Sequence, residues 1–236
     1  MDVQKSIISV KRNEFKYLLT FDEALRLKEQ ISAVLSPDEY SLDGPYRVKS
    51  LYFDSINNVD FLTKHAGDNI RKKIRLRIYG EDLPTAKLEL KSKEGIYQNK
   101  SSVTVSKETA KQLVRGNYGV LLDYKSEEAI KIYSMLVLGC YKPAVIVEYD
   151  RMAYAYSEYK TRITFDTAVK SSELDLDLYK KDLPYSPVIF DRAILEVKYN
   201  EKLPGFLSEI LKRYSINNVS VSKYCQGRHF FQNYIA

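Results

Sequence analysis

Five stretches of the sequence place charged residues at every second position, with apolar residues between them. In the clearest of these, Lys73, Arg75 and Arg77 alternate with isoleucine and leucine. A β-strand points successive side chains to opposite faces of its sheet, so each stretch predicts one charged and one apolar face. The five polar sets are Arg12, Glu14 and Lys16; Lys73, Arg75 and Arg77; Lys87, Glu89 and Lys91; Arg162, Thr164 and Asp166; Glu196 and Lys198.

The common explanation of such a strand is a sheet with its apolar face on a core and its charged face in water. Two features favour a polar interior instead. Candidate helices flank several of the strands and could cover the apolar faces, and the charged faces use arginine where exposed strands usually carry Thr, Ser or Lys. If the charged faces meet inside a closed barrel, the cations repel one another unless an anion of high charge density lies between them.

A chain of phosphates meets that requirement. Arginine offers planar pairs of donors to phosphate oxygens and lysine offers a compact charge, so a mixed set can bind successive phosphates along a line. The interspersed glutamates would repel phosphate unless a hard divalent cation bridges them, which predicts Mn²⁺ or Mg²⁺ as cofactor.

Composition supports an anionic ligand and limits the kind of metal site. There are 37 Lys and Arg against 31 Asp and Glu, a net charge of +6, which favours anionic partners. Cys140 and Cys225 are the only cysteines, so we expect neither a disulfide framework nor a cysteine metal site. His65 and His229 are too few for a histidine-rich zinc site. A metal would therefore bind oxygen ligands.

The chain reads as one domain, residues 1–236, because no repeat and no stretch rich in Pro, Gly or Ser divides it. The start of the sequence lacks the apolar core of a signal peptide, and no apolar run approaches the roughly 18 residues that span a bilayer. We therefore expect a cytoplasmic protein without a transmembrane segment.

Strand-like segments outnumber helical ones. Strands are predicted at Ile8–Tyr17, Tyr46–Asp54, Lys72–Tyr79, Ala86–Lys93, Gln98–Val105, Ala144–Tyr156, Thr161–Phe165 and Ala193–Tyr199. Helices are predicted from Thr20 towards Leu35, from Ser106 to near Gly116, from Ser126 to Gly139, from about Pro204, and from Ser222 towards the C-terminus. This mixed order, with enough strands for a barrel, predicts an α+β fold.

The same strands resemble a known superfamily. Arg12-x-Glu14-x-Lys16 resembles the E-x-E-x-K signature of the triphosphate tunnel metalloenzymes, the CYTH superfamily, although Arg12 replaces its first glutamate. The motifs RNEFKY, SLYFDS, KIRLRIYG, KLELKSKEG, VEYDRMAY, TRITFD, ILEVKY and SVSKY, in this order, are similar to the polyphosphate polymerase domain of the vacuolar transporter chaperone complex, the VTC domain. The resemblance extends over about residues 8–230 and implies a closed antiparallel β-barrel, the triphosphate tunnel fold, with flanking helices.

The resemblance also implies roles for individual residues. The cations that act on the phosphates would be Arg75, Arg77, Lys91, Arg151, Lys198 and Lys223. Further substrate contacts would come from Lys16, Tyr149, Ser222 and Lys100, although a solvated lysine is the simpler reading of Lys100. Glu196 would be the principal metal ligand, with Glu14 and Glu89 as further candidates that could equally form structural ion pairs. Tyr52 and Asp54 are expected to pack in the wall. Ser220 stands where the resemblance leads us to expect another basic residue, which weakens one phosphate contact.

The implied reaction is transfer of the γ-phosphate of ATP to a growing inorganic polyphosphate chain, assisted by Mn²⁺ or Mg²⁺. No phosphate-binding glycine loop of the P-loop or kinase type occurs, so ATP would be held through its phosphates. Two alternatives stay open. One is an inorganic or nucleoside triphosphatase of the same fold, and the other is a non-catalytic module that binds polyphosphate or single-stranded nucleic acid with the chain's 20 tyrosines. Expected partners are ATP and inorganic polyphosphate or triphosphate. No nucleic acid is expected, and whether a membrane protein is also a partner stays open.

Overall fold

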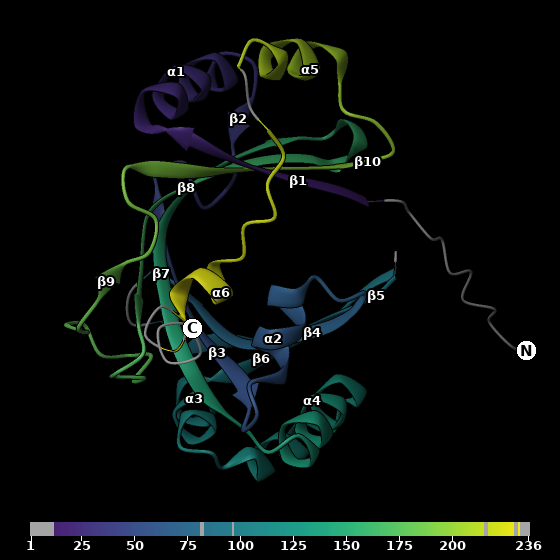
Figure 1. Cartoon of the computed structure of the whole chain (residues 1–236), viewed down its shortest axis with the longest axis vertical. Coiled ribbons are helices and arrows are strands. Elements are labelled where there is room, and N and C mark those ends of the chain that lie inside the picture. Colours follow the sequence, from purple (N-terminus) through teal and green to yellow (C-terminus); the bar gives the residue numbers. More distant parts are fainter. Residues whose placement is uncertain (1–11, 81–82, 96, 215–216, 229–230, 232–236) are drawn as a thin grey trace, which may run out of the picture. The chain divides into compact units, whose positions relative to one another are not determined.

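The computed structural model describes residues 12–80, 83–95, 97–214, 217–228 and 231. The first four residues of the strand predicted from Ile8, and His229, therefore lie outside the described residues. The chain divides into two compact units, which Figure 1 colours along the sequence. The first comprises Met1–Pro45, Arg151–Thr167 and Asp191–Val221, and the second comprises Tyr46–Asp150, Ala168–Phe190 and Ser222–Ala236. The single domain expected from the sequence stays a prediction.

The last strand of the sequence lies in the middle of the sheet of the first unit. β10 (Arg192–Asn200) pairs antiparallel with β1 (Arg12–Thr20) on one side and with β8 (Thr161–Ser172) on the other. The two-residue strand β2 (Ser36–Pro37) pairs with the C-terminal part of β7 (Tyr141–Tyr156). β7 and β8 contribute residues to both units.

Two helices cover the apolar face of this sheet. α1 (Phe21–Ser32) and α5 (Gly205–Lys212) lie side by side in Figure 1, and a short 3₁₀ turn, η2 (Glu158–Lys160), precedes β8. The predicted capping box is confirmed, because Glu23 accepts from the Thr20 amide at 2.8 Å and Thr20 accepts from the Glu23 amide at 3.3 Å. The buried core between helices and sheet contains Leu27, Ile31, Ile163, Phe165, Leu195, Val197 and Leu207.

α1 ends at Ser32, earlier than the predicted end near Leu35. Pro37 disfavours a helical backbone at the residue before it, and Ser36 instead pairs with Ala155 as part of β2. Leu35 still reaches the core, but from the bend between α1 and β2.

The second unit contains an antiparallel meander. β3 (Tyr46–Ser55), β4 (Ile70–Tyr79), β5 (Thr85–Glu94) and β6 (Tyr97–Ser106) follow one another in the sheet as they do in the sequence. β7 lies next to β3, and the short β9 (Ser186–Pro187) pairs with β8. Each predicted strand of this unit is found, within three residues of its predicted ends.

The helices of the second unit lie in the connections. α3 (Lys107–Val114) follows β6, and η1 (Tyr118–Tyr124) and α4 (Glu127–Leu138) lead to β7. Ser106 and Ser126 cap α3 and α4 as predicted. α6 (Lys223–Gly227) begins after Ser222, also as predicted, whereas α2 (Val59–Ala66) was not expected from the sequence.

The apolar face of β4 and β5 is buried under these connections. Ile74, Leu76 and Leu88 are fully buried and share one core with Leu113 of α3 and Leu136 of α4. Helices therefore cover the apolar faces of the alternating strands in both units, as the sequence predicted.

The predicted α+β fold with an antiparallel sheet and flanking helices is confirmed, while its closure into a barrel stays a prediction. None of the helices in the described part of the chain has the length and apolar character that crossing a membrane requires. Neither Cys140 nor Cys225 forms a disulfide within the described part of the chain.

Candidate functional site

A buried carboxylate organises the charged face of the second unit. Glu89 on β5 lies opposite Arg75 on β4 in the strand register, and its Oε2 is 2.7 Å from Arg75 Nε and 3.8 Å from Arg77 Nη1. Its Oε1 is 2.5 Å from Lys100 Nζ on β6. Burial alone would raise the pKa of Glu89, but the three cations outweigh it and hold that pKa far below its usual value.

Hydroxyl groups from neighbouring strands fix the two arginines. Arg75 Nη1 donates to the Tyr52 hydroxyl at 3.3 Å. Arg77 donates through Nε to Ser50 Oγ at 3.1 Å and through Nη2 to the Tyr149 hydroxyl at 3.4 Å. Only 7% of Arg77 is exposed. Arg75 and Arg77 are therefore held in largely buried positions, whereas a sheet with its charged face in water would leave them exposed.

Three further cations lie on the same side of the sheet as Arg75 and Arg77. Lys73 Nζ donates to Ser222 Oγ at 2.7 Å and lies over the Tyr224 ring, 5.7 Å from its centroid. Lys223 lies over the Tyr149 ring at 4.7 Å. Lys91 is exposed on β5, directly across from Lys73. The structure thus brings together eight predicted site residues in the second unit: Arg75, Arg77, Lys91, Lys100, Tyr149, Ser222, Lys223 and Glu89. Lys73 and Tyr52, which were not predicted as site residues, belong to the same group.

The first unit carries a second buried ion pair. Arg151 donates through Nε and Nη2 to the two oxygens of Asp166, at 2.6 and 2.7 Å. Asp166 is completely buried, and this paired geometry fixes the plane of the guanidinium. Glu196 Oε2 lies 4.0 Å from Arg151 Nη2, and Glu196 Oε1 is paired with Lys198.

The remaining predicted residues of this unit lie on β1. Glu14 Oε1 is 3.1 Å from Lys16 Nζ, and Glu14 Oε2 is 3.9 Å from Lys198 Nζ. Lys16 lies opposite Glu196 in the register, and Glu14 lies opposite Lys198. The predicted residues Lys16, Arg151, Lys198, Glu14 and Glu196 therefore form one alternating arrangement of both charge signs.

A family model for the VTC domain matches residues 11–232. The chain belongs to the VTC domain family. The family predicted from the eight motifs is therefore confirmed. No curated protein sequence matches the chain.

Solved structures share the fold of this VTC domain at low sequence identity. A protein from Hippeastrum that is named as an adenylyl cyclase and has a dominant triphosphatase activity is 15% identical, with a TM-score of 0.58 over 92% of this chain and 95% of the other. A protein from Bacillus halodurans that is named as an adenylate cyclase is 17% identical, with a TM-score of 0.51 over 90% and 95%. These likenesses establish a common fold.

The carboxylates of the VTC domain differ in how well they fit a metal. Both oxygens of Glu89 contact cations, which favours the structural ion pair that the sequence left open. Glu196 and Glu14 offer the hard oxygen donors that Mn²⁺ and Mg²⁺ prefer, but each is also paired with lysine. Within the described ranges, no three Asp, Glu, His or Cys residues are grouped so as to hold a metal ion. A divalent ion thus fits Glu196 and Glu14 only together with oxygens of a bound phosphate.

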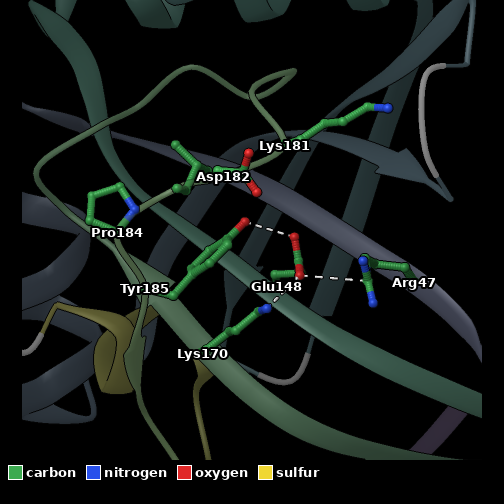
Figure 2. Close-up of a pocket in the computed structure, with 8 residues that line it drawn as sticks. Arg47, Glu148, Lys170, Lys181, Asp182, Pro184 and Tyr185 are labelled. Atoms are coloured by element: carbon green, nitrogen blue, oxygen red, sulfur yellow. Dashed lines mark hydrogen bonds and ion pairs between the residues drawn. The ribbon is translucent and has the colours of Figure 1, made fainter.

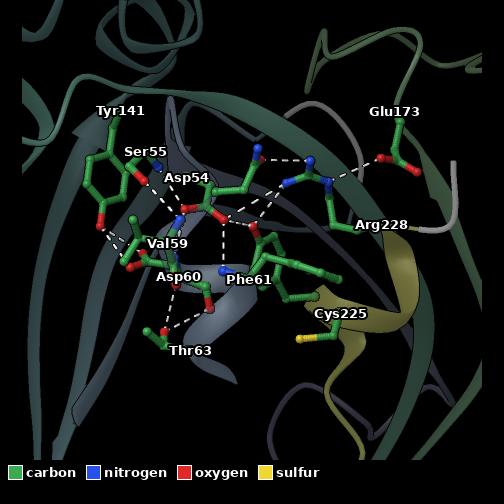
Figure 3. A network of polar contacts seen from close by, with 12 residues as sticks. Asp54, Ser55, Val59, Asp60, Phe61, Thr63, Tyr141, Glu173, Cys225 and Arg228 are labelled. Carbon is green, nitrogen blue, oxygen red and sulfur yellow. Dashed lines mark hydrogen bonds and ion pairs between the residues drawn. The ribbon is translucent and has the colours of Figure 1, made fainter. Parts of the chain in front are cut away.

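Asp54 of the SLYFDS motif does more than pack in the wall of the VTC domain (Figure 3). It accepts hydrogen bonds from the Asp60 and Phe61 amides at 3.0 and 2.9 Å and one from the Tyr224 hydroxyl. Arg228 donates to Tyr224 Oη at 3.2 Å. Asp54 thereby joins the start of α2 to α6, the helix that carries Lys223 and is capped by Ser222.

A pocket of about 680 Å³ occurs on the other face of β7 (Figure 2). Its buried carboxylate, Glu148, accepts from the Tyr185 hydroxyl at 2.7 Å and pairs with Lys170 at 3.0 Å. Glu148 is adjacent in sequence to Tyr149, so the two side chains point to opposite faces of the strand. None of the predicted site residues lines this pocket.

Tyr52 gives the cation cluster a dependence on pH. Burial alone would raise its pKa, but the charges of Arg75, Arg77 and Lys73 outweigh burial and lower the pKa to about 8. A polyanion bound to these cations neutralises their charges and therefore raises the pKa of Tyr52 again. By linkage, the anion binds more weakly as Tyr52 ionises above pH 8.

Between pH 7 and pH 9, we therefore expect the Kd for tripolyphosphate to rise in both proteins. The factor of this rise should be about ten times larger for the wild type than for Tyr52→Phe. Calorimetric titration of both proteins at the two pH values measures this, and titration of tripolyphosphate itself cancels in the comparison. Equal rises for the two proteins would exclude Tyr52 as the titrating group.

Proposed function

We propose that this VTC domain is a metal-dependent polyphosphate polymerase, which transfers the γ-phosphate of ATP to a growing inorganic polyphosphate chain. The observation that carries the proposal is the set of three cations, the largely buried Arg75 and Arg77 and the half-exposed Lys100, around the single buried carboxylate of Glu89. Gathering several cations in a buried place is costly unless an anion compensates them. Family membership supports a phosphate chain as that anion, and the predicted closed barrel belongs to the same proposal.

The cations supply what phosphoryl transfer requires. The reaction needs attacking and leaving oxygens in line and stabilisation of charge on the equatorial oxygens of the transferred group, with little covalent chemistry from the protein. Arg75 and Arg77 are already oriented by Glu89 and by hydroxyl groups, so they lose little freedom when phosphate binds. Lys91, Lys100 and Lys223 would add charge around the phosphates, with hydrogen bonds from Tyr149 and Ser222.

In the first unit, Arg151, Lys198 and Lys16 would also bind phosphate. Asp166 holds Arg151 in one orientation, and this fits a role in binding an equatorial oxygen. Glu196, with Glu14 as second candidate, would hold Mn²⁺ or Mg²⁺ together with phosphate oxygens. The bound ion would neutralise negative charge that develops on the transferred group.

A triphosphatase is the second candidate, because the Hippeastrum protein of the same fold has a dominant triphosphatase activity. The same cations would then stabilise attack by water in place of a polyphosphate end. Transfer and hydrolysis differ in their products, so one assay separates them.

The purified protein should be incubated with ATP and Mn²⁺ and the products separated on a gel. The polymerase predicts long-chain polyphosphate and ADP, with loss of both in the double variant Arg75→Ala/Arg77→Ala. Orthophosphate without polymer would identify a triphosphatase. Binding of polyphosphate without any metal-dependent turnover would leave the non-catalytic module as the function.

A further inference from the structure

Thr164 on β8 carries a buried hydroxyl whose role the ion pairs do not explain. Only 2% of the residue is exposed, and its Oγ1 makes no hydrogen bond within the described part of the chain. A buried hydroxyl loses its hydration on folding, so one that stays unsatisfied in the protein destabilises the folded state. Such groups in native proteins call for a specific explanation.

The strand register places this hydroxyl on the charged face of the first unit. Ile163 and Phe165, the neighbours of Thr164, point into the core under the helices, so Thr164 points the other way. It lies directly opposite Glu196, which in turn lies opposite Lys16. Two residues further along β8, Asp166 holds Arg151.

The surroundings favour a phosphate oxygen as the missing partner. Lys16, Lys198 and Arg151 are cations on this face. Each is paired with a carboxylate, and its other N–H donors can bind an anion. Side chains across a pair of antiparallel strands have Cβ atoms about 5 Å apart, so an anion between Arg151 and Lys16 comes within reach of the Thr164 hydroxyl. Glu196 Oε1, the nearest alternative acceptor by register, is already paired with Lys198.

We propose that Thr164 is a substrate-binding residue, whose hydroxyl donates a hydrogen bond to a non-bridging oxygen of the phosphate held by Arg151 and Lys16. This assignment rests on the proposed function and adds a neutral donor to its cations. It also predicts an unusual combination of effects. The hydroxyl lowers the stability of the protein without ligand and raises its affinity for the ligand.

The test replaces the hydroxyl by a methyl group of nearly the same shape. For Thr164→Val, we expect the Kd of tripolyphosphate to rise about tenfold, equivalent to about 1.4 kcal/mol, in calorimetric titration. The melting temperature without ligand should stay the same or rise, because an unsatisfied hydroxyl has been removed. Thr164→Ser keeps the hydroxyl and should retain most of the affinity.

Thr161 provides a matched control on the same strand. It is also 2% exposed, but its Oγ1 donates to the Glu158 carbonyl at 3.0 Å. Thr161→Val should therefore lower the melting temperature and leave the Kd unchanged. Thr164→Ala gives the same comparison if Thr164→Val does not fold.

Three results would overturn the assignment. Wild-type affinity in Thr164→Val would show that the hydroxyl does not contact the ligand, although tripolyphosphate binding by the wild type would still support the proposed function. A lower melting temperature with unchanged affinity would assign Thr164 a structural role. Failure of the wild type to bind tripolyphosphate would refute the proposed function and this assignment together.

Discussion

Arg77→Ala is expected to lower ATP turnover by about 10³-fold, the effect typical of removing one preorganised donor to a transition-state charge. The expected loss of stability is small. Arg77 bonds the hydroxyls of Ser50 and Tyr149, and Glu89 keeps its closer partners Arg75 and Lys100 when Arg77 is removed. Removing one of several buried cations also relieves their mutual repulsion.

Two controls separate this effect from unfolding. Leu76 is the fully buried neighbour of Arg77 on β4, and Leu76→Ala should cost about 2–5 kcal/mol of unfolding free energy through the cavity it leaves. Lys131 is an exposed cation on α4, and Lys131→Ala should change neither quantity. A drop in melting temperature for Arg77→Ala as large as that for Leu76→Ala would contradict the prediction.

Asp166→Ala is expected to have the largest effect on stability among the charged residues. Removing the carboxylate leaves Arg151 without the acceptor that pairs with it at 2.6 and 2.7 Å, and breaking one side of a buried pair typically costs about 3–5 kcal/mol. For a chain of this size that corresponds to a fall of about 10 °C in melting temperature. Calorimetric unfolding measures both quantities.

The ligand should restore part of what Asp166→Ala loses, because a phosphate supplies a new anionic partner for Arg151. The exposed pair of Asp22 and Arg26 in the same unit, 2.8 Å apart, is the matched control, and Asp22→Ala should cost less than about 1 kcal/mol. A loss for Asp166→Ala no larger than for Asp22→Ala would show that the buried pair does not stabilise the first unit.

The strands could be predicted because their evidence is local. In β4, the alternation of Lys73, Arg75 and Arg77 with apolar residues has the period of a strand, and the observed strand begins only two residues before the predicted one. The cap of α1 was found for the same reason, since Thr20 and Glu23 are three residues apart.

α2 was missed because its stabilising contacts are not local. The residue before the helix, Asn58, has a left-handed backbone, and its side chain makes no capping hydrogen bond. Asp54, at the end of β3, accepts from the first amides of the helix instead. A helix of eight residues that is capped by the preceding strand leaves no start signal of the usual kind.

The sequence predicted on which face of a strand each charged residue of the site lies, but it did not predict which residues form ion pairs. Alternation put Glu89 and Asp166 on charged faces, yet their partners depend on strand order and register. Arg151 and Asp166 belong to β7 and β8, and Glu89 meets cations of both β4 and β6. The unsatisfied hydroxyl of Thr164 could not be recognised before its neighbours were known.

The most direct test of the phosphate-chain hypothesis is the melting temperature of the wild type with orthophosphate, pyrophosphate or tripolyphosphate at equal concentration. A ligand that binds only the folded state raises the melting temperature according to its affinity. If the cations around Glu89 bind successive phosphates, tripolyphosphate should give the largest shift and orthophosphate the smallest, and Arg75→Ala/Arg77→Ala should reduce the tripolyphosphate shift most. Equal shifts from all three anions would contradict recognition of a linear phosphate chain.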